Sequence, residues 1–251
     1  MTGIAVVGLH RGGTSAVAGV LHHLGVFMGD QLLPPSPHNP KGYFEDIRFV
    51  TLHTKIMGGD WKFPRPDFMD SWEKYKDEYL SLVNEFTQHE VWGVKDPRLC
   101  HCLPLLRVAT ENKLKVLAVW RDPWEASHSL LERGGHTFEE AFRISISHIA
   151  AMLVNTWESA GVLYVPFDWL VGNPEASVAH MAGWLGLEFK QEAADFLDRD
   201  LVHHTDIPEW HDRSDYQPVA CCPYCGIYAG CYVMEEHVKT CYKREANGDV
   251  A

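Results

Sequence analysis

The stretch "IAVVGLHRGGTSAVAGVLHHLG", residues 4–25, decides the fold. A short apolar run, Ile4–Gly8, ends in a glycine-rich loop and predicts a buried strand. Thr14 or Ser15 then caps a predicted helix. A strand, a glycine loop and a helix in this order form a phosphate-binding arrangement, because backbone N–H groups and the helix N-terminus face an anion.

The loop "GLHRGGTS", residues 8–15, nearly matches the nucleotide-binding pattern Gly-x-x-x-x-Gly-Lys-Ser/Thr. Gly8 and Gly13 have the required spacing, but Thr14 stands at the lysine position and Arg11 lies inside the loop. In nucleoside triphosphate enzymes the lysine neutralises the β- and γ-phosphates, and the Ser or Thr binds magnesium. The missing lysine therefore disfavours ordinary ATP or GTP hydrolysis.

Strand and helix patterns alternate over the first 200 residues. Apolar runs predict further strands at 91–94, 115–120 and 162–167. Cap and stop residues predict further helices over about 123–134, 138–160 and 173–186. We therefore expect an α/β fold, a P-loop-like parallel sheet with helices on both faces. Residues 58–75 are rich in Gly, Pro and aromatic residues, and predict either an irregular packed connection or a substrate-facing lid.

The composition limits the ligand and the compartment. The chain has 251 residues and a net charge of −12, which disfavours a nucleic-acid binder. An acidic protein that binds an anion needs a few Arg, Lys and backbone N–H groups at the binding site, because the negative charge of the whole protein repels the anion. No stretch approaches the roughly 20 apolar residues that span a membrane. The N-terminus lacks the basic start and apolar run of a signal peptide. We expect a soluble, cytoplasmic protein.

The C-terminal region is rich in cysteine. Five of the seven cysteines fall between Cys221 and Cys241. The spacing Cys222-x2-Cys225, eleven residues, then His237-x3-Cys241 predicts a small zinc site. A disulfide pair and a disordered tail are the alternatives. The expected organisation is an α/β domain over 1–205, a connector over 206–220 and a zinc-finger-like module over 221–243. Charges in the module nearly cancel, so a structural flap or protein docking is favoured over nucleic-acid binding.

Two motifs carry a resemblance to a known family. The loop at 8–15 resembles the 5′-phosphosulfate loop of sulfotransferases that use 3′-phosphoadenosine 5′-phosphosulfate (PAPS). The stretch "WRDPWEASHSL", 120–130, is similar to the 3′-phosphate motif of that family, with Arg121 and Ser129 in the matching positions. Arg121 follows a predicted strand and Ser129 lies two turns into the next helix, so both side chains can reach one phosphate. "NPKGYFED" (39–46), "VKDPRL" (94–99) and the closing unit 165–189 extend the resemblance over about residues 3–200.

The resemblance implies an enzyme that transfers a sulfuryl group in line from PAPS to an acceptor hydroxyl or amine and releases adenosine 3′,5′-bisphosphate. It implies the following cofactor-binding residues: His10, Arg11, Gly12, Gly13, Thr14, Ser15, Arg121 and Ser129. Arg11 takes over the role of the missing lysine. Lys95 is expected to be a second cation at the leaving group, with an ion pair to Asp96 as the alternative. Glu45 is the favoured base, and Asp46 and His38 are its rivals.

Other roles stay open at this stage. Arg98 and Arg213 are considered for contact with PAPS or substrate, with a structural role preferred for both. Trp124 and Trp61 are available for adenine stacking or for core packing. The acceptor is expected to be a small molecule or a carbohydrate, and a protein partner is considered for the zinc finger. The rival functions are a P-loop small-molecule kinase and a non-catalytic nucleotide-binding protein with a partner-docking zinc finger.

Overall fold

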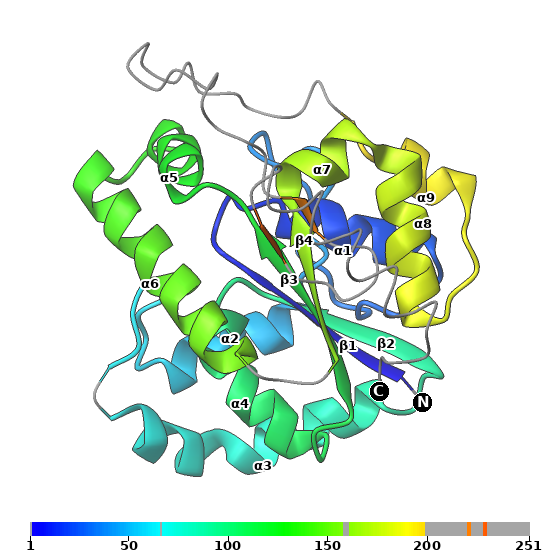
Figure 1. The fold of residues 1–251 in the computed structure, drawn as a ribbon. Coiled ribbons are helices and arrows are strands. Elements are labelled where there is room, and N and C mark those ends of the chain that lie inside the picture. The colour runs from blue at the N-terminus through cyan, green and yellow to red at the C-terminus, as the bar shows by residue number, and fades with distance from the viewer. Residues whose placement is uncertain (1, 66, 158–160, 199–219, 222–227, 230–251) are drawn as a thin grey trace. The chain divides into compact units, whose positions relative to one another are not determined.

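The structure is a computed structural model that describes residues 2–65, 67–157 and 161–198, and the backbone of residues 220–221 and 228–229 (Figure 1). The chain divides into two compact units, Met1–Thr205 and Asp206–Ala251. Each unit is described by itself.

A four-stranded parallel sheet forms the centre of the first unit. Its strands are β1 (Thr2–Gly8), β2 (Val91–Lys95), β3 (Leu114–Trp120) and β4 (Val162–Pro166). The spatial order is β2-β1-β3-β4, and every pairing is parallel. The chain first crosses to one side of β1 and then to the other, so the strand order reverses beside β1. Open α/β sheets bind ligands outside the carboxyl ends of their strands at such a reversal.

Helices cover both faces of this sheet, which confirms the predicted α/β fold (Figure 1). The helices are α1 (Thr14–His23), α2 (Ile47–Ile56), α3 (Phe68–Phe86), α4 (Leu99–Ala109), α5 (Pro123–Glu132), α6 (Phe138–Thr156), α7 (Phe167–Gly172), α8 (Pro174–Leu185) and α9 (Gln191–Asp195). Strand β1 alternates between the two faces. Ile4 and Val6 pack with α1 and α8, whereas Ala5 and Val7 pack with α2, α3 and α4. Alternation with period two buries both faces of a central strand.

Several predicted helix boundaries are confirmed and two expectations are wrong. The Thr137 hydroxyl accepts a hydrogen bond from the Glu140 N–H at 3.2 Å, and Gly186 ends α8 in a left-handed conformation. However, α1 begins after Gly13 with no side-chain cap, so neither Thr14 nor Ser15 is its N-cap. Residues 68–75 are not irregular, because they form the first two turns of α3.

Helix α3 was hidden by its composition. Its buried residues are Trp72, Tyr79, Leu82, Val83 and Phe86, and they form a stripe that packs in one core cluster with residues of α2 and α4. Prolines, glycines and aromatic residues are common at and before the start of this helix, and this composition is typical of a loop. Tertiary packing of the apolar stripe stabilises the helix in spite of that start.

The described part of the second unit is a minimal hairpin. Strands β5 (Ala220–Cys221) and β6 (Tyr228–Ala229) pair antiparallel, with Cys221 opposite Tyr228. The predicted zinc ligands Cys222, Cys225, His237 and Cys241 lie outside the described residues, as does Arg213. Within the residues that are described, no helix combines the length and the apolar character needed to cross a bilayer.

Candidate functional site

A cavity of about 160 Å3 opens at the carboxyl ends of β1, β2 and β3. Eight of the residues predicted for the site line it: His10, Arg11, Gly13, Thr14, Ser15, Glu45, Lys95 and Arg121. Gly12 and Ser129 do not line the cavity and are buried next to it. The parallel sheet therefore brings together residues from the loop, from the segment after α1 and from the ends of β2 and β3, the two strands that flank β1.

Gly13 shapes the loop at the start of α1. Its φ of +88° belongs to the left-handed region, and a Cβ at this position would lie 2.1 Å from the Phe167 ring. Only glycine fits both constraints. Arg11 is also left-handed, with a φ of +63°, which is an unfavourable conformation for a residue with a Cβ. Strain of this kind is typical of residues held for function, and here it directs the arginine side chain out of the loop.

The two motifs that resemble the PAPS sites meet through Arg11. Its Nε donates to Ser129 Oγ at 2.9 Å, although the two residues are 118 positions apart in the sequence. Arg121 Nη1 donates to the backbone carbonyl of Arg11 at 2.8 Å. The guanidinium of Arg121 also lies 4.7 Å from the centre of the Phe167 ring and pairs with Glu125 at 3.4 Å. Loop, strand end and helix thus form one polar cluster.

The cavity is locally positive in a protein with a net charge of −12. Its lining includes the cations Arg11, Lys41, Lys95, Arg121 and Arg133, and the acids Glu45 and Asp198. Burial, and then the charges of Arg133 and Arg121, lower the pKa of Arg11. Arg11 stays cationic, because a guanidinium is not deprotonated in proteins, and an anion between these guanidinium groups would relieve their repulsion.

Sequence reasoning missed Lys41 and Arg133. Lys41 belongs to the segment "NPKGYFED" and pairs with Asp198 at 3.3 Å, and Arg133 follows the last residue of α5. Each looks like an ordinary surface cation in the sequence. Arg133 lies four positions after Ser129, so helical periodicity predicts that the two residues share one face of the helix.

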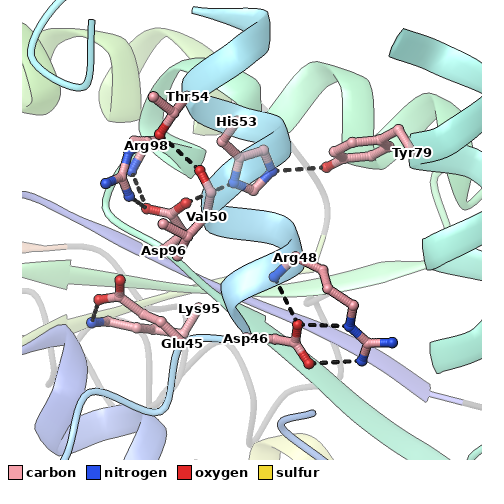
Figure 2. Close-up of polar contacts among 10 residues, drawn as sticks. All are labelled: Glu45, Asp46, Arg48, Val50, His53, Thr54, Tyr79, Lys95, Asp96 and Arg98. Atoms are coloured by element: carbon pink, nitrogen blue, oxygen red, sulfur yellow. Dashed lines mark hydrogen bonds and ion pairs between the residues drawn. The ribbon is translucent and has the colours of Figure 1, made fainter. Parts of the chain in front are cut away.

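Lys95 and Glu45 form a buried ion pair at the floor of the cavity (Figure 2). Lys95 is the last residue of β2 and Glu45 lies just before α2, and the two are 3% and 7% exposed. Lys95 Nζ also donates to Ser15 Oγ at 3.0 Å. The alternative pairing of Lys95 with Asp96 is wrong. Figure 2 shows the two side chains leaving the strand end in different directions.

The structure separates the three candidates for the base. Asp46 caps α2 by accepting from the Arg48 N–H at 3.0 Å, and it also binds the Arg48 guanidinium at 2.9 and 2.8 Å (Figure 2). It does not line the cavity. His38 lines the cavity with an exposed side chain, and its backbone carbonyl accepts from Arg11. Glu45 is the carboxylate of the segment that faces the loop.

A second polar network lies behind the cavity and was not predicted (Figure 2). Asp96 accepts from His53 Nδ1 at 2.8 Å and, with its other oxygen, from the Arg98 N–H at 3.0 Å and Arg98 Nη1 at 2.6 Å. His53 Nε2 lies 3.1 Å from the Tyr79 hydroxyl. Burial favours the neutral acid, but the Arg98 charge and the His53 hydrogen bond hold the pKa of Asp96 well below its usual value. The network joins the end of β2 to α2 and α3.

Neither tryptophan considered for adenine stacking lines the cavity. The Trp61 ring packs edge-on against His10 with centroids 4.7 Å apart, and Trp124 packs against Phe138 at 4.6 Å. The aromatic residues in the lining are Tyr43, Phe167 and Phe196. Arg98 does not line the cavity either, so its role is in the network around Asp96.

Among the residues that are described, no three His, Cys, Asp or Glu side chains form a group that could hold a metal ion. This statement does not cover the predicted zinc ligands, which lie outside those residues.

No family model matches the chain, and no curated protein matches it either. Among solved structures, the chain is similar to the sulfotransferase domain of the Synechococcus olefin synthase, with 16% identity and a TM-score of 0.49 over 84% of this chain and 82% of that one. The chain is also similar to a sulfotransferase from Mycobacterium tuberculosis, with 17% identity and a TM-score of 0.48 over 78% of this chain and 70% of that one. A sulfotransferase from Alicyclobacillus acidocaldarius matches with 14% identity and a TM-score of 0.45 over 80% of this chain and 88% of that one. Identities and TM-scores this low do not assign the chain to a family.

Proposed function

We propose that this chain is a sulfotransferase that moves a sulfuryl group from PAPS to an acceptor hydroxyl or amine. The observation that carries the proposal is the hydrogen bond from Arg11 to Ser129 beside Arg121. Because the Ser129 oxygen accepts from Arg11, its own hydrogen remains available to donate to a phosphate. A loop for the 5′-phosphate and a cationic site for the 3′-phosphate in one cluster suit a bisphosphorylated adenosine.

The chemistry needs cations at the leaving oxygen and a base at the acceptor. In the proposed reaction the acceptor oxygen or nitrogen attacks sulfur, the bond from sulfur to the bridging oxygen breaks, and adenosine 3′,5′-bisphosphate leaves. Arg11 and Lys95 stabilise the charge that grows on the bridging oxygen. Glu45 accepts the acceptor's proton, and Lys95 orients its carboxylate. Gly12, Gly13, Thr14 and Ser15 supply backbone N–H groups and hydroxyls to the 5′-phosphate, and His10 borders the transferred group.

Calorimetric titration with adenosine 3′,5′-bisphosphate tests the proposal. We expect micromolar binding without metal, which corresponds to about −8 kcal/mol. Arg121→Ala should weaken binding at least tenfold, because charged hydrogen bonds contribute roughly 1.5–3 kcal/mol. Arg143→Ala, at an exposed position of α6, is the matched control and should bind like the wild type. Unchanged binding by Arg121→Ala would contradict the proposed 3′-phosphate site.

Turnover separates an enzyme from a nucleotide-binding protein. With labelled PAPS and a screen of alcohols, phenols, carbohydrates and amines, we expect transfer that Glu45→Gln reduces by 10²-fold or more, the usual effect of removing a general base. Tight binding of the bisphosphate without transfer to any acceptor, and no effect of Glu45→Gln on any reaction of PAPS, would favour the non-catalytic alternative.

One observation favours the kinase as a second candidate. Lys95 Nζ lies 3.0 Å from Ser15 Oγ, so a lysine from β2 reaches the loop that lacks its own. Against this, His53 and Arg98 engage both carboxylate oxygens of Asp96, the acid at the end of β2 that would support magnesium. ATP with magnesium is titrated beside the bisphosphate. Binding of ATP with magnesium and not of the bisphosphate would reverse the order of the two candidates.

We also propose that Cys222, Cys225, His237 and Cys241 hold one zinc ion in a module that docks a protein partner or serves as a structural flap. The support is their spacing in the sequence, together with the β5–β6 hairpin that flanks the first pair. Purified protein should contain one zinc per chain by elemental analysis. Cys222→Ser should lose it, whereas Cys231→Ser, outside the ligand set, should keep it. Equal zinc contents in the two variants would contradict this ligand set.

A further inference from the structure

Two polar links join helix α2 to the end of strand β2 (Figure 2). The first is the ion pair between Glu45, just before α2, and Lys95, the last residue of β2. The second is the hydrogen bond between His53, in the second turn of α2, and Asp96, the residue that follows Lys95. His53 Nδ1 and Asp96 Oδ2 are 2.8 Å apart, and both side chains are fully buried. The pair to which we assign the chemistry is therefore attached to a second pair behind it.

The spacing of residues on α2 makes both links possible. Asp46 is the N-cap of α2, and His53 lies about two helical turns after it. Residues two turns apart share one face of a helix, so His53 faces the end of β2 on the side from which Glu45 enters. About 10 Å of helix separates the two attachment points. The second attachment therefore restricts rotation of α2 about the first.

Asp96 is the residue at which the second link branches. Its Oδ2 accepts from His53, and its Oδ1 accepts from the Arg98 N–H at 3.0 Å and from Arg98 Nη1 at 2.6 Å. Its backbone carbonyl accepts from the N–H of Leu99, the first residue of α4, at 2.9 Å. The one residue therefore holds both α2 and the turn that follows Lys95.

The hydrogen bonds determine which nitrogen of His53 carries the proton. Burial favours neutral Asp96, but the Arg98 charge and the His53 hydrogen bond hold the pKa of Asp96 well below its usual value, so its carboxylate only accepts. His53 Nδ1 then donates to Asp96, and Nε2 accepts from the Tyr79 hydroxyl at 3.1 Å. Both nitrogens of His53 and both oxygens of Asp96 are paired. Displacing either side chain would leave a buried polar group without its partner, which is costly.

Neither His53 nor Asp96 lines the cavity, so any effect on a ligand there passes through their neighbours. Those neighbours do line it, because Lys95 and Pro97 flank Asp96 and Glu45 lies at the start of α2. A shift of α2 against β2 would therefore move the Glu45 carboxylate relative to the Lys95 ammonium group. A displacement of about 1 Å in a reacting group can lower a rate by about 10²-fold.

We propose that His53 and Asp96 are positioning residues, which hold α2 on the end of β2 so that the Glu45 carboxylate stays aligned with Lys95 at the floor of the cavity. This inference deepens the proposed sulfotransferase function, and its effect on turnover rests on that function. The alternative is a network that stabilises the fold without aligning the pair. The two differ in what they predict, because a network that only stabilises would leave turnover by the folded protein unchanged.

Two polar variants separate the bond from His53 to Asp96 from its bond to Tyr79. In His53→Asn the amide nitrogen takes the place of Nδ1 and keeps a donor to Asp96. In His53→Gln it reaches the place of Nε2, so the bond to Asp96 is lost. With PAPS and an acceptor found in the screen, we expect kcat of His53→Gln to fall at least about tenfold and that of His53→Asn to stay within about threefold of the wild type.

Binding and a matched control show whether the loss is one of alignment. The Kd of adenosine 3′,5′-bisphosphate should change less than about twofold in both His53 variants, because neither residue of the link lines the cavity. Thr156→Val removes a buried hydroxyl that joins α6 to Tyr164 of β4, and it should keep the wild-type kcat and Kd. A fall in kcat of folded Thr156→Val as large as that of His53→Gln would overturn the positioning role.

Nuclear magnetic resonance of the full chain with 15N-labelled lysine tests the alignment without any reaction. The buried Lys95 ammonium group should give an Nζ–H resonance that is absent from Lys95→Met. We expect this resonance to shift in His53→Gln and to keep its position in His53→Asn and in Thr156→Val. Where His53→Gln does not fold, His53→Phe takes its place, because it keeps the ring that packs between Phe49 and Tyr79.

The outcomes separate this proposal from the sulfotransferase proposal. If the bisphosphate does not bind, or no acceptor is sulfated, the sulfotransferase proposal fails, and the Lys95 resonance still decides whether the link aligns the pair. An unmoved Lys95 resonance in His53→Gln refutes the positioning role. Equal kcat values for His53→Gln and His53→Asn, in an active enzyme, refute it as well.

Discussion

The ion pair of Lys95 and Glu45 offers the sharpest test of the site's energetics, because both side chains are almost withdrawn from water. Lys95→Met removes one charge and leaves the buried Glu45 carboxylate without its ion-pair partner. Glu45→Leu leaves Lys95 with the Ser15 hydroxyl, at 3.0 Å, as its remaining partner. The double variant replaces both charges by apolar side chains of similar size.

The expected free energies follow from the burial. Removing one partner of a buried pair costs roughly 3–5 kcal/mol, whereas replacing both by apolar residues is close to neutral. We expect Lys95→Met to lose about 4 kcal/mol and Glu45→Leu about 3 kcal/mol, because only Lys95 keeps a polar partner. The double variant should lie within about 1 kcal/mol of the wild type. With an m-value near 3 kcal/mol/M, a loss of 3 kcal/mol lowers the urea midpoint by about 1 M.

Urea unfolding followed by tryptophan fluorescence measures the three variants against the wild type. A double-mutant cycle gives the interaction between the two positions. Losses that simply add in the double variant would refute the argument, because independent side chains add. Loss of sulfuryl transfer in the double variant, with stability retained, would separate the catalytic role of the pair from its effect on folding.

Three further perturbations test the loop, the 3′-phosphate site and the buried side chain of His148. Gly13→Ala should lower the free energy of unfolding by more than about 2 kcal/mol, because the new Cβ meets the Phe167 ring. Gly59→Ala, at a φ of +83° but in open space, should lower it by about 1 kcal/mol. Equal losses in thermal unfolding would contradict the clash at Gly13. Ser129→Ala should weaken bisphosphate binding about tenfold, and Ser127→Ala, a buried serine of the same helix, should not. Burial lowers the pKa of His148 to about 4, so below about pH 6.5 the unfolded chain binds a proton that the folded chain does not. His148 alone should therefore lower the stability by roughly 3 kcal/mol between about pH 6.5 and pH 4. His148→Phe should flatten this decline in urea titrations, and an unchanged slope would refute it.

Much of the fold follows from local sequence patterns. The four strands were predicted within two residues of their observed bounds, because buried parallel strands are short apolar runs that end at a glycine or a polar residue. The sequence also predicted the capping box at the start of α6 and the stop at Gly186 after α8. Both are local features, because each pairs backbone groups at a helix end with residues a few positions away. Helix α3 was missed, because its stability comes from packing against α2 and α4 and its first turn has a loop-like composition.

The candidate site was readable in part. Eight predicted residues line the cavity, because motifs at strand ends and helix starts carry their position in the sheet with them. Lys41 was missed, since an isolated surface cation has no local pattern, and Arg133 was missed although it lies one helical turn beyond Ser129. The sequence favoured Glu45 over Asp46 as the base, and this stays a prediction. What only the structure shows is that Arg48 binds the Asp46 carboxylate, whereas Glu45 lines the cavity.

The sequence by itself determined a strand, a glycine loop that contains an arginine and lacks the P-loop lysine, and a helix that follows this loop. These features are local, because backbone geometry at Gly13 and the polarity of the loop depend on neighbouring residues. Only the tertiary structure decided that Arg11 meets Ser129 and that Lys95 meets Glu45, across 118 and 50 positions. Placing β1 between β2 and β3 brings the ends of three strands to one edge, and that order is a property of the packed sheet.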